Sequence, residues 1–130
     1  MKNQVTSIEQ SERLIELGVP AERASMAWID PLDTNEYILT SKLRHFYPSE
    51  QDIAAFTVAD LLGIIPKTIT DGRGIVYKLN IGICSSTNHC WYLYWGDDER
   101  QIGWQERISI LNALEDAIEW IVITGRKLNL

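Results

Sequence analysis

Residues 75–95 read IVYKLNIGICSSTNHCWYLYW and predict a β-hairpin around which the rest of the chain packs. Apolar residues alternate along both arms, and a period of two places such residues on one face of a strand. They occupy odd positions, namely Ile75, Tyr77, Leu79, Ile81, Ile83, Trp91, Leu93 and Trp95. We expect odd residues to pair with odd residues, because a slip of one position would turn one arm's apolar set to the wrong face. The simplest register sets Ile81 opposite Leu93.

The even positions of the hairpin form its second face, which is rich in tyrosine. The pairs on this face in the same register are Asn80 with Tyr94, Gly82 with Tyr92, and Cys84 with Cys90. If no helix covers this face, Tyr92, Tyr94, Asn80 and Lys78 form a candidate partner-binding surface, because exposed aromatic side chains contribute much of the energy of protein interfaces. The alternative is that a helix or the N-terminal segment covers the face, and the tyrosines are then structural.

Three helices are predicted outside the hairpin, over residues 7–17, 58–65 and 110–124. Each carries apolar residues three or four positions apart, which gives one apolar helix face. Thr6 or Ser7 caps the first helix, because each is followed three residues later by Glu or Gln. Thr57 and Asp60 form a similar N-terminal pair on the second helix, and Gly125 ends the third.

The remaining segments give weaker patterns. Residues 101–105 alternate and predict a third short strand that extends the hairpin into a meander. Residues 37–40 favour a strand, and Pro20 favours a second short helix over about 20–26. Residues 41–56 lack a clear period, although Ile53–Phe56 is compatible with the start of a helical turn.

These elements predict one α+β domain over residues 1–130. Its small antiparallel sheet is centred on the 75–95 hairpin, and three to four helices pack mainly on one face. The chain has 130 residues, of which 45% are apolar, and it contains no internal repeat or linker. A chain of this size buries roughly two-thirds of its unfolded surface, which is enough for one core.

The charge and composition of the chain argue against two classes of partner. The formal net charge is −6, whereas a phosphate-binding surface needs clustered Lys and Arg, so we expect no nucleic-acid partner. No apolar run approaches the ~20 residues of a membrane span, so we expect no membrane partner either. The first residues lack the apolar segment of a signal peptide. Together with only two cysteines, this predicts a cytoplasmic protein with reduced thiols.

Cys84, His89 and Cys90 form the candidate metal or thiol site. Zinc needs four protein ligands in a structural site, or three and a water in a catalytic one, and His45 could supply the fourth. The two cysteines are separated by five residues, which is wider than usual zinc spacings, and a cysteine commonly acts as a small apolar residue. We therefore expect no metal and no cofactor. A small enzyme or metal-binding protein that uses these three residues is the alternative.

Two acidic clusters provide a further alternative. They are Asp97-Asp98-Glu99 on a turn, and Glu115, Asp116 and Glu119 on the outward face of the last predicted helix. Paired carboxylates can perform acid–base chemistry when their environments separate their pKa values, but solvated surface charge is the commoner explanation. If the clusters formed one continuous stripe, the protein would be an acidic mimic of nucleic acid that inhibits a DNA-binding protein. No phosphate loop, GxSxG or HExxH motif is present.

The segment TVADLLGIIP at residues 57–66 resembles one that recurs in a group of small uncharacterised bacterial proteins, often from prophages or mobile elements. The sequences WYLYW (91–95), NALEDAIEWIVITG (112–125) and LGVP (17–20) are similar to that group in the same order. The resemblance implies no known activity and no functional residues. With no catalytic set in the sequence, the leading hypothesis is a non-enzymatic accessory protein that binds another macromolecule, with a protein as the expected partner.

Overall fold

The computed structural model describes residues 4–42, 51–83, 89–96, 101–107 and 109–130. It contains two antiparallel sheets and three α-helices within these residues, so the α+β class is confirmed. The chain divides into two compact units, residues 1–61 and 62–130, which are described in turn. The boundary falls inside one helix, and the second sheet was not predicted from the sequence.

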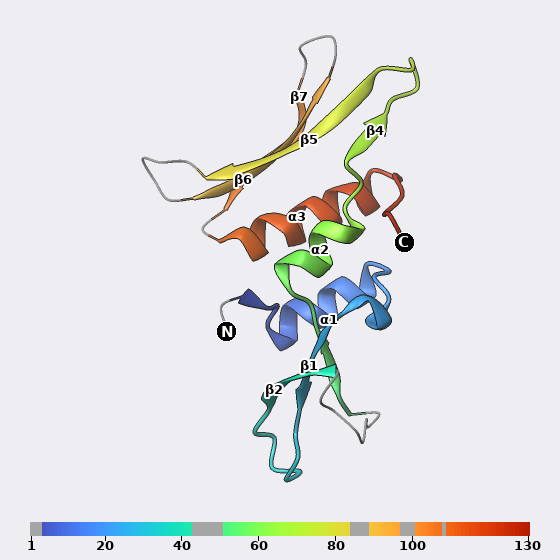
Figure 1. Ribbon diagram of the computed structural model, residues 1–130. Coiled ribbons are helices and arrows are strands. Elements are labelled where there is room, and N and C mark those ends of the chain that lie inside the picture. Colours follow the sequence, from blue (N-terminus) through green and yellow to red (C-terminus); the bar gives the residue numbers. More distant parts are fainter. Residues whose placement is uncertain (1–3, 43–50, 84–88, 97–100, 108) are drawn as a thin grey trace. The chain divides into compact units, whose positions relative to one another are not determined.

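The first unit combines one helix with a three-stranded sheet of order β2-β1-β3 (Figure 1). Its elements are α1 (Ile8–Glu16), the 3₁₀ turn η2 (Ala21–Arg23), β1 (Met26–Ile29), β2 (Ile38–Ser41), β3 (Ile53–Ala55) and the start of α2 (Val58–Ile64). Helix α1 packs against β3.

The strand predicted near 37–40 is confirmed as β2. The helical turn predicted from Ile53 is wrong, because residues 53–55 form strand β3. This strand pairs with β1, for example Ala54 with Ala27, and a pairing between residues so far apart in the chain is not visible in the local sequence.

Thr6 joins the N-terminal segment to the rest of this unit and is fully buried. Its hydroxyl accepts a hydrogen bond from the Phe56 backbone N–H at 3.0 Å and lies 2.7 Å from the Ser11 hydroxyl. Since Ser11 donates its own proton to the Ser7 carbonyl, Thr6 is the donor to Ser11. The Thr6 carbonyl accepts from the indole N–H of Trp28 at 3.0 Å. This Thr6 network therefore satisfies buried polar groups from segments 22 and 50 residues away.

The predicted helix caps are both present. The Ser7 hydroxyl accepts from the Gln10 N–H at 3.1 Å, and the Gln10 side chain accepts from the Ser7 N–H, which completes a capping box. On α2, Thr57 and Asp60 bond each other's backbone N–H groups in the same way. One oxygen of Asp60 also accepts from the backbone and hydroxyl of Ser25, so this carboxylate ties the start of α2 to the residue before β1.

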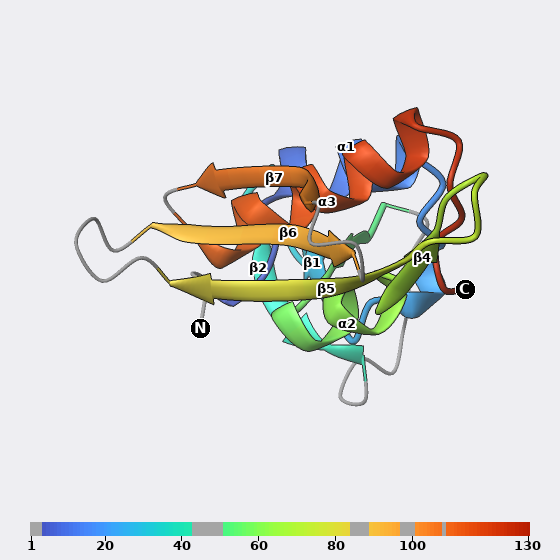
Figure 2. The ribbon, with the colours of Figure 1, turned by 90° about the horizontal axis from the view of Figure 1, so that it is seen from above.

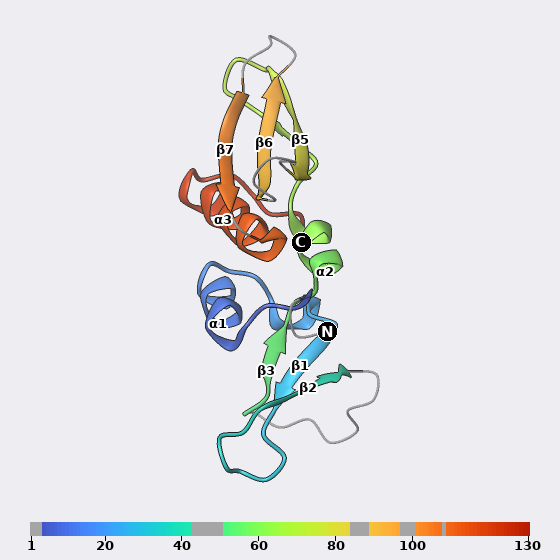
Figure 3. The ribbon, with the colours of Figure 1, turned by 90° about the vertical axis from the view of Figure 1, so that its left-hand side faces the viewer.

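The second unit is a four-stranded antiparallel sheet of order β4-β5-β6-β7 with one long helix packed on β6 and β7. Figures 2 and 3 show these strands side by side, with the helix along one face. The elements are β4 (Thr68–Thr70), β5 (Val76–Ile83), β6 (Cys90–Gly96), β7 (Gln101–Arg107) and α3 (Ile110–Ile123). Leu114 and Ile118 of α3 are fully buried, as predicted, and the third strand of the meander is confirmed as β7.

The register of the central hairpin is shifted by one residue from the predicted one. Ile81 lies opposite Tyr92, and Leu93 lies opposite Asn80, so odd positions on β5 pair with even positions on β6. The prediction failed because every residue of β6 from Cys90 to Trp95 is apolar or aromatic, so neither face of that strand was marked as the exposed one.

A β-bulge interrupts the pairing of β6 with β7. Tyr92 pairs with Gln105 and Tyr94 pairs with Ile102, so one residue of β6 faces two residues of β7. Gly103 lies in this bulge with φ +67°, and a methyl group on its Cα would fall 2.9 Å from the Trp120 ring. Glycine is therefore required here for both its backbone conformation and its lack of a side chain.

The turn between β4 and β5 is organised by Asp71. One carboxylate oxygen accepts the backbone N–H groups of Arg73 and Ile75, and the other accepts the Arg73 guanidinium and the Tyr77 hydroxyl. Burial alone would raise the pKa of Asp71. The hydrogen bonds from Ile75, Arg73 and Tyr77 outweigh this effect and lower the pKa to about 2.

Candidate functional site

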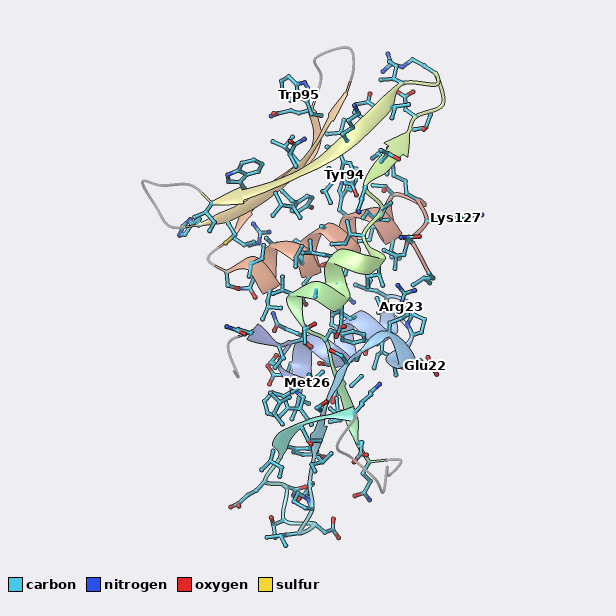
Figure 4. All side chains as sticks on the ribbon, in the orientation of Figure 1. Glu22, Arg23, Met26, Tyr94, Trp95 and Lys127 are labelled. Carbon is cyan, nitrogen blue, oxygen red and sulfur yellow. The ribbon has the colours of Figure 1, made fainter. Side chains whose placement is uncertain are left out.

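The four residues predicted to bind a partner do not share one face. Tyr92 and Tyr94 are fully buried beneath α3, whereas Lys78 and Asn80 are exposed on the opposite face of the sheet. Figure 4 shows Tyr94 directed toward α3 and Trp95 directed away from it. The prediction of an open tyrosine surface is therefore wrong, and the alternative is confirmed: a helix covers this face and the tyrosines are structural.

The two tyrosines bury their rings because each hydroxyl has a hydrogen-bond acceptor. Tyr92 donates to the Asp116 carbonyl at 3.3 Å, and Tyr94 donates to the Pro66 carbonyl at 2.7 Å. Burial raises the pKa of both hydroxyls well above the ordinary value for tyrosine. Both side chains are therefore neutral parts of the core and take no part in an exposed binding surface.

The shifted register places tryptophan where tyrosine was expected. We name as the outer face the side of the sheet away from α3, where β6 presents Trp91, Leu93 and Trp95, and β5 presents Gly82, Asn80 and Lys78 directly opposite them. Trp91 and Leu93 are half-buried, and 45% of Trp95 is exposed. The outer face is therefore an apolar strip along β6 beside two polar side chains of β5.

Trp91 is fixed in position on the outer face by the glycine opposite it. A methyl group on Gly82 would fall 2.5 Å from the Trp91 ring, so the indole lies directly against the backbone of β5. An aromatic ring that covers a cross-strand glycine shields that backbone and holds the register. The predicted register places Tyr92 opposite Gly82, because alternation alone does not distinguish it from Trp91.

A second feature is a cavity of about 250 Å³ where β6, β7 and α3 meet. Its lining residues are Tyr92, Arg107, Asp116, Glu119, Trp120 and Ile123. Arg107 of β7 forms an ion pair with Asp116 of α3, and 42% and 25% of their side chains are exposed. Asp116 was predicted to be a solvated charge on the outward side of its helix, and this is wrong because Arg107 reaches it from β7.

Charged side chains of both signs lie at this cavity. Burial raises the pKa of Asp116, Glu119 raises it further, and Arg107 lowers it without cancelling the other effects. Two carboxylates, Asp116 and Glu119, and one guanidinium, Arg107, line the cavity, and a second guanidinium, Arg126, lies over its Trp120 wall.

Trp120 forms one wall of the cavity. Its ring stacks on Tyr94 with centroids 5.6 Å apart and an interplanar angle of 26°. The Arg126 guanidinium lies 4.8 Å from the Trp120 ring centroid, within the range of a cation–π interaction. Gly103 contacts the same ring from β7. The indole thus lies against three neighbours.

The structure brings no metal site together in its described part. Cys90 is buried with a free thiol and pairs with Ile83, where the predicted register had Cys84. Cys84, His45 and the Asp97-Asp98-Glu99 cluster lie outside the described residues. Among the residues that are described, no three His, Cys, Asp or Glu side chains are grouped so as to hold a metal ion.

Comparison with known proteins gives no match to a family, to a curated protein or to a solved structure. Within the described part of the chain, no helix combines the length and the apolar character needed to cross a membrane. The outer face and the cavity are therefore interpreted from their own geometry and chemistry.

Proposed function

We propose that the protein is a non-enzymatic accessory protein that binds another protein through the outer face. The observation that carries this proposal is the exposure of Trp95 at one end of the apolar strip that also contains Trp91 and Leu93. Tryptophan is enriched among the residues that dominate interface energies. Lys78 and Asn80 provide the polar edge that typically surrounds such a centre.

The kind of partner follows from charge and from the chemistry of the strip. The net charge of −6 disfavours a nucleic acid, whereas an apolar strip with a polar edge is typical of protein interfaces. The free thiol of Cys90 is consistent with action in the cytoplasm. The resemblance to small bacterial and prophage proteins is the basis for proposing that the protein serves a bacterium or one of its mobile elements.

The experiment uses the full chain to recover binding partners from a cell extract. The recovered partner is then purified, and its affinity is measured for the wild type and for two variants. Trp95→Ser removes an exposed side chain of the outer face. Leu32→Ser is the matched control, because Leu32 is 76% exposed and lies in the other unit. We expect Trp95→Ser to weaken binding at least about 30-fold, which corresponds to a hot-spot residue, and Leu32→Ser to leave binding unchanged.

The proposal is refuted if both Trp95→Ser and Leu93→Asp bind the recovered protein as tightly as the wild type does. Leu93 lies next to Trp95 on the same face, so a charge there must disturb any partner seated on the strip. The thermal unfolding midpoint of each variant confirms that a loss of binding does not reflect unfolding.

A further inference from the structure

We propose that the partner protein adds an extended segment to the free edge of β5, where it pairs with Ile81 and Ile83 as an antiparallel strand. This edge adjoins the outer face, because Gly82 of that face lies between the two isoleucines. The inference rests on the proposed function in that it requires a protein partner. It adds pairing between backbones to the side-chain contacts of the outer face.

The edge of β5 is only partly covered by β4, and Figure 2 shows β4 beside the beginning of β5. Strand β4 pairs with β5 from Val76 to Lys78, and the Leu79 N–H donates to the Lys67 carbonyl at 2.8 Å. Pro66 precedes Lys67, and proline has no N–H with which to continue the pairing. In the described part of the chain, no further strand or backbone hydrogen bond occupies this edge beyond Leu79.

The direction of the backbone groups follows from the bond at Leu79. In an antiparallel strand, the N–H and C=O of one residue point to the same side, and successive residues alternate sides. Because the Leu79 N–H points toward β4, the N–H and C=O groups of Ile81 and Ile83 point to the same edge. The pairing of β5 with β6 has no register shift over these residues, so the alternation is kept. Two donors and two acceptors therefore face away from β6, and another extended backbone is the ligand that matches such a row.

The side chains around this edge define the character of the added segment. Ile83 is 69% exposed and Ile81 is half-buried, so residues opposite them should be apolar and β-branched, which pair well across strands. The residue opposite Gly82 would point to the outer face. There the Trp91 ring lies over Gly82, with its Cζ2 atom 2.5 Å and its Cη2 atom 3.1 Å from the position of an added methyl group. An apolar side chain at this place would therefore meet the edge of the indole.

The charge of the chain limits the residues that flank the segment. The formal net charge is −6, so basic or neutral flanks are favoured over acidic ones. The expected segment is thus three consecutive apolar residues, mainly β-branched, between neutral or basic residues.

The test is a titration of the ¹⁵N-labelled full chain with the peptide Ac-Lys-Val-Val-Val-Lys-NH₂, followed by NMR. We expect saturable shifts at the amides of Ile81 and Ile83 and at the Trp91 indole N–H, with a Kd on the order of 1 mM. In the proposed pairing, the three valines lie opposite Ile83, Gly82 and Ile81 in that order. The N–H groups of the first and third valines then point to β5, and that of the central valine points away.

Two N-methylated forms of this peptide are the matched pair, because they have the same composition and charge. Methylation of the third valine's nitrogen removes a donor that faces β5 and should abolish the saturable shifts. Methylation of the central valine's nitrogen should change the Kd less than about threefold, because that group faces solvent.

The substitution Ile83→Pro tests the edge from the side of the protein. The Ile83 N–H faces away from β6, so proline removes an edge donor and leaves the pairing with β6 in place. Ile83→Thr is the matched control, because threonine is β-branched and keeps the N–H. We expect Ile83→Pro to weaken the unmethylated peptide at least about tenfold and Ile83→Thr to weaken it less than about threefold. The N-methylated peptides test the same pairing in the wild-type chain, so the result does not depend on the folding of a variant.

The proposal is overturned if the unmethylated peptide produces no saturable shifts, if the two N-methylated peptides bind alike or in the reverse order, or if Ile83→Pro binds as tightly as Ile83→Thr. The partner recovered from the extract separates this inference from the proposed function. Loss of its affinity for both Ile83→Pro and Trp95→Ser supports both. Loss for Trp95→Ser alone supports the outer face and overturns the strand pairing, whereas loss for Ile83→Pro alone supports the strand pairing and counts against the outer face.

Discussion

The substitution Gly103→Ala should destabilise the second unit through two separable effects. The φ of +67° costs a residue with a Cβ roughly 1–2 kcal/mol. The added methyl group would also fall 2.9 Å from the Trp120 ring, and overpacking of this kind costs about 1–3 kcal/mol. We therefore expect Gly103→Ala to lower the free energy of unfolding by about 2–5 kcal/mol.

Gly125→Ala is the matched control for this prediction. Gly125 has φ +76° and has no atom within 4 Å of the position that a Cβ would occupy, so only the backbone effect applies. Its expected cost is ~1–2 kcal/mol. The assay is urea unfolding followed by tryptophan fluorescence, with the midpoint and slope compared between the variants.

A double substitution tests the assigned cause. In Trp120→Leu, the smaller side chain gives the new methyl group room, so adding Gly103→Ala to this background should cost no more than Gly125→Ala does alone. The reasoning is refuted if Gly103→Ala and Gly125→Ala cost the same in the native background, or if Trp120→Leu leaves the cost of Gly103→Ala unchanged.

Three further outcomes are expected. Leu114→Ala should cost about 2–5 kcal/mol in urea unfolding, because Leu114 is fully buried, and a cost below about 0.5 kcal/mol would show that this helix face is not core. Thr6→Val should cost roughly 1–3 kcal/mol, because the buried Phe56 N–H loses its acceptor, and hydrogen exchange at that amide should accelerate. Asp71 has a pKa of about 2 in the folded chain against an ordinary value of 3.8, so its stabilising effect is present above about pH 4 and is lost as the pH falls toward 2. The difference in thermal midpoint between wild type and Asp71→Asn should therefore be constant above pH 4 and shrink below it, and a difference that grew on acidification would contradict this.

Local signals in the sequence were sufficient for the three α-helices and for β2, β5, β6 and β7, but β1, β3 and β4 were not predicted. The helix caps are contacts between residues three positions apart, so both partners can be read from a short stretch of sequence. They are the capping box of Ser7 with Gln10 and the pair of Thr57 with Asp60. Strand β3 could not be found in this way, because it is stabilised by β1 and that pairing is not local. Alternation placed the odd residues of β5 correctly as far as Ile81, with Tyr77 buried and Leu79 and Ile81 half-buried. It was wrong for Ile83, which is 69% exposed, and it failed on β6.

The candidate site was missed for a related reason. On a strand where tyrosine and tryptophan alternate, alternation does not show which side faces the helix, and buried tyrosine hydroxyls need acceptors elsewhere in the fold. Tyr92 and Tyr94 find theirs at the carbonyls of Asp116 and Pro66, which lie 24 and 28 residues away. The pairing of Arg107 with Asp116 is equally non-local, because it requires β7 and α3 to be packed together. One signal was present in the sequence: Gly82 lies on the strand opposite a run of aromatic residues, which indicates that an aromatic ring covers the Gly82 backbone.

The Thr6 network has a consequence for the order in which the first unit can fold. The hydrogen bond between Thr6 and Phe56 closes a loop of 50 residues, and the length-dependent part of the entropy cost of such closure is about 3.5 kcal/mol. During synthesis the chain emerges from its N-terminus, so the Thr6 hydroxyl and the Thr6 backbone N–H lack their Phe56 partners until Phe56 has left the ribosome. We therefore expect the first unit to fold late in its own translation, in one cooperative step, and a nascent chain that stalls before residue 56 should remain open to proteases.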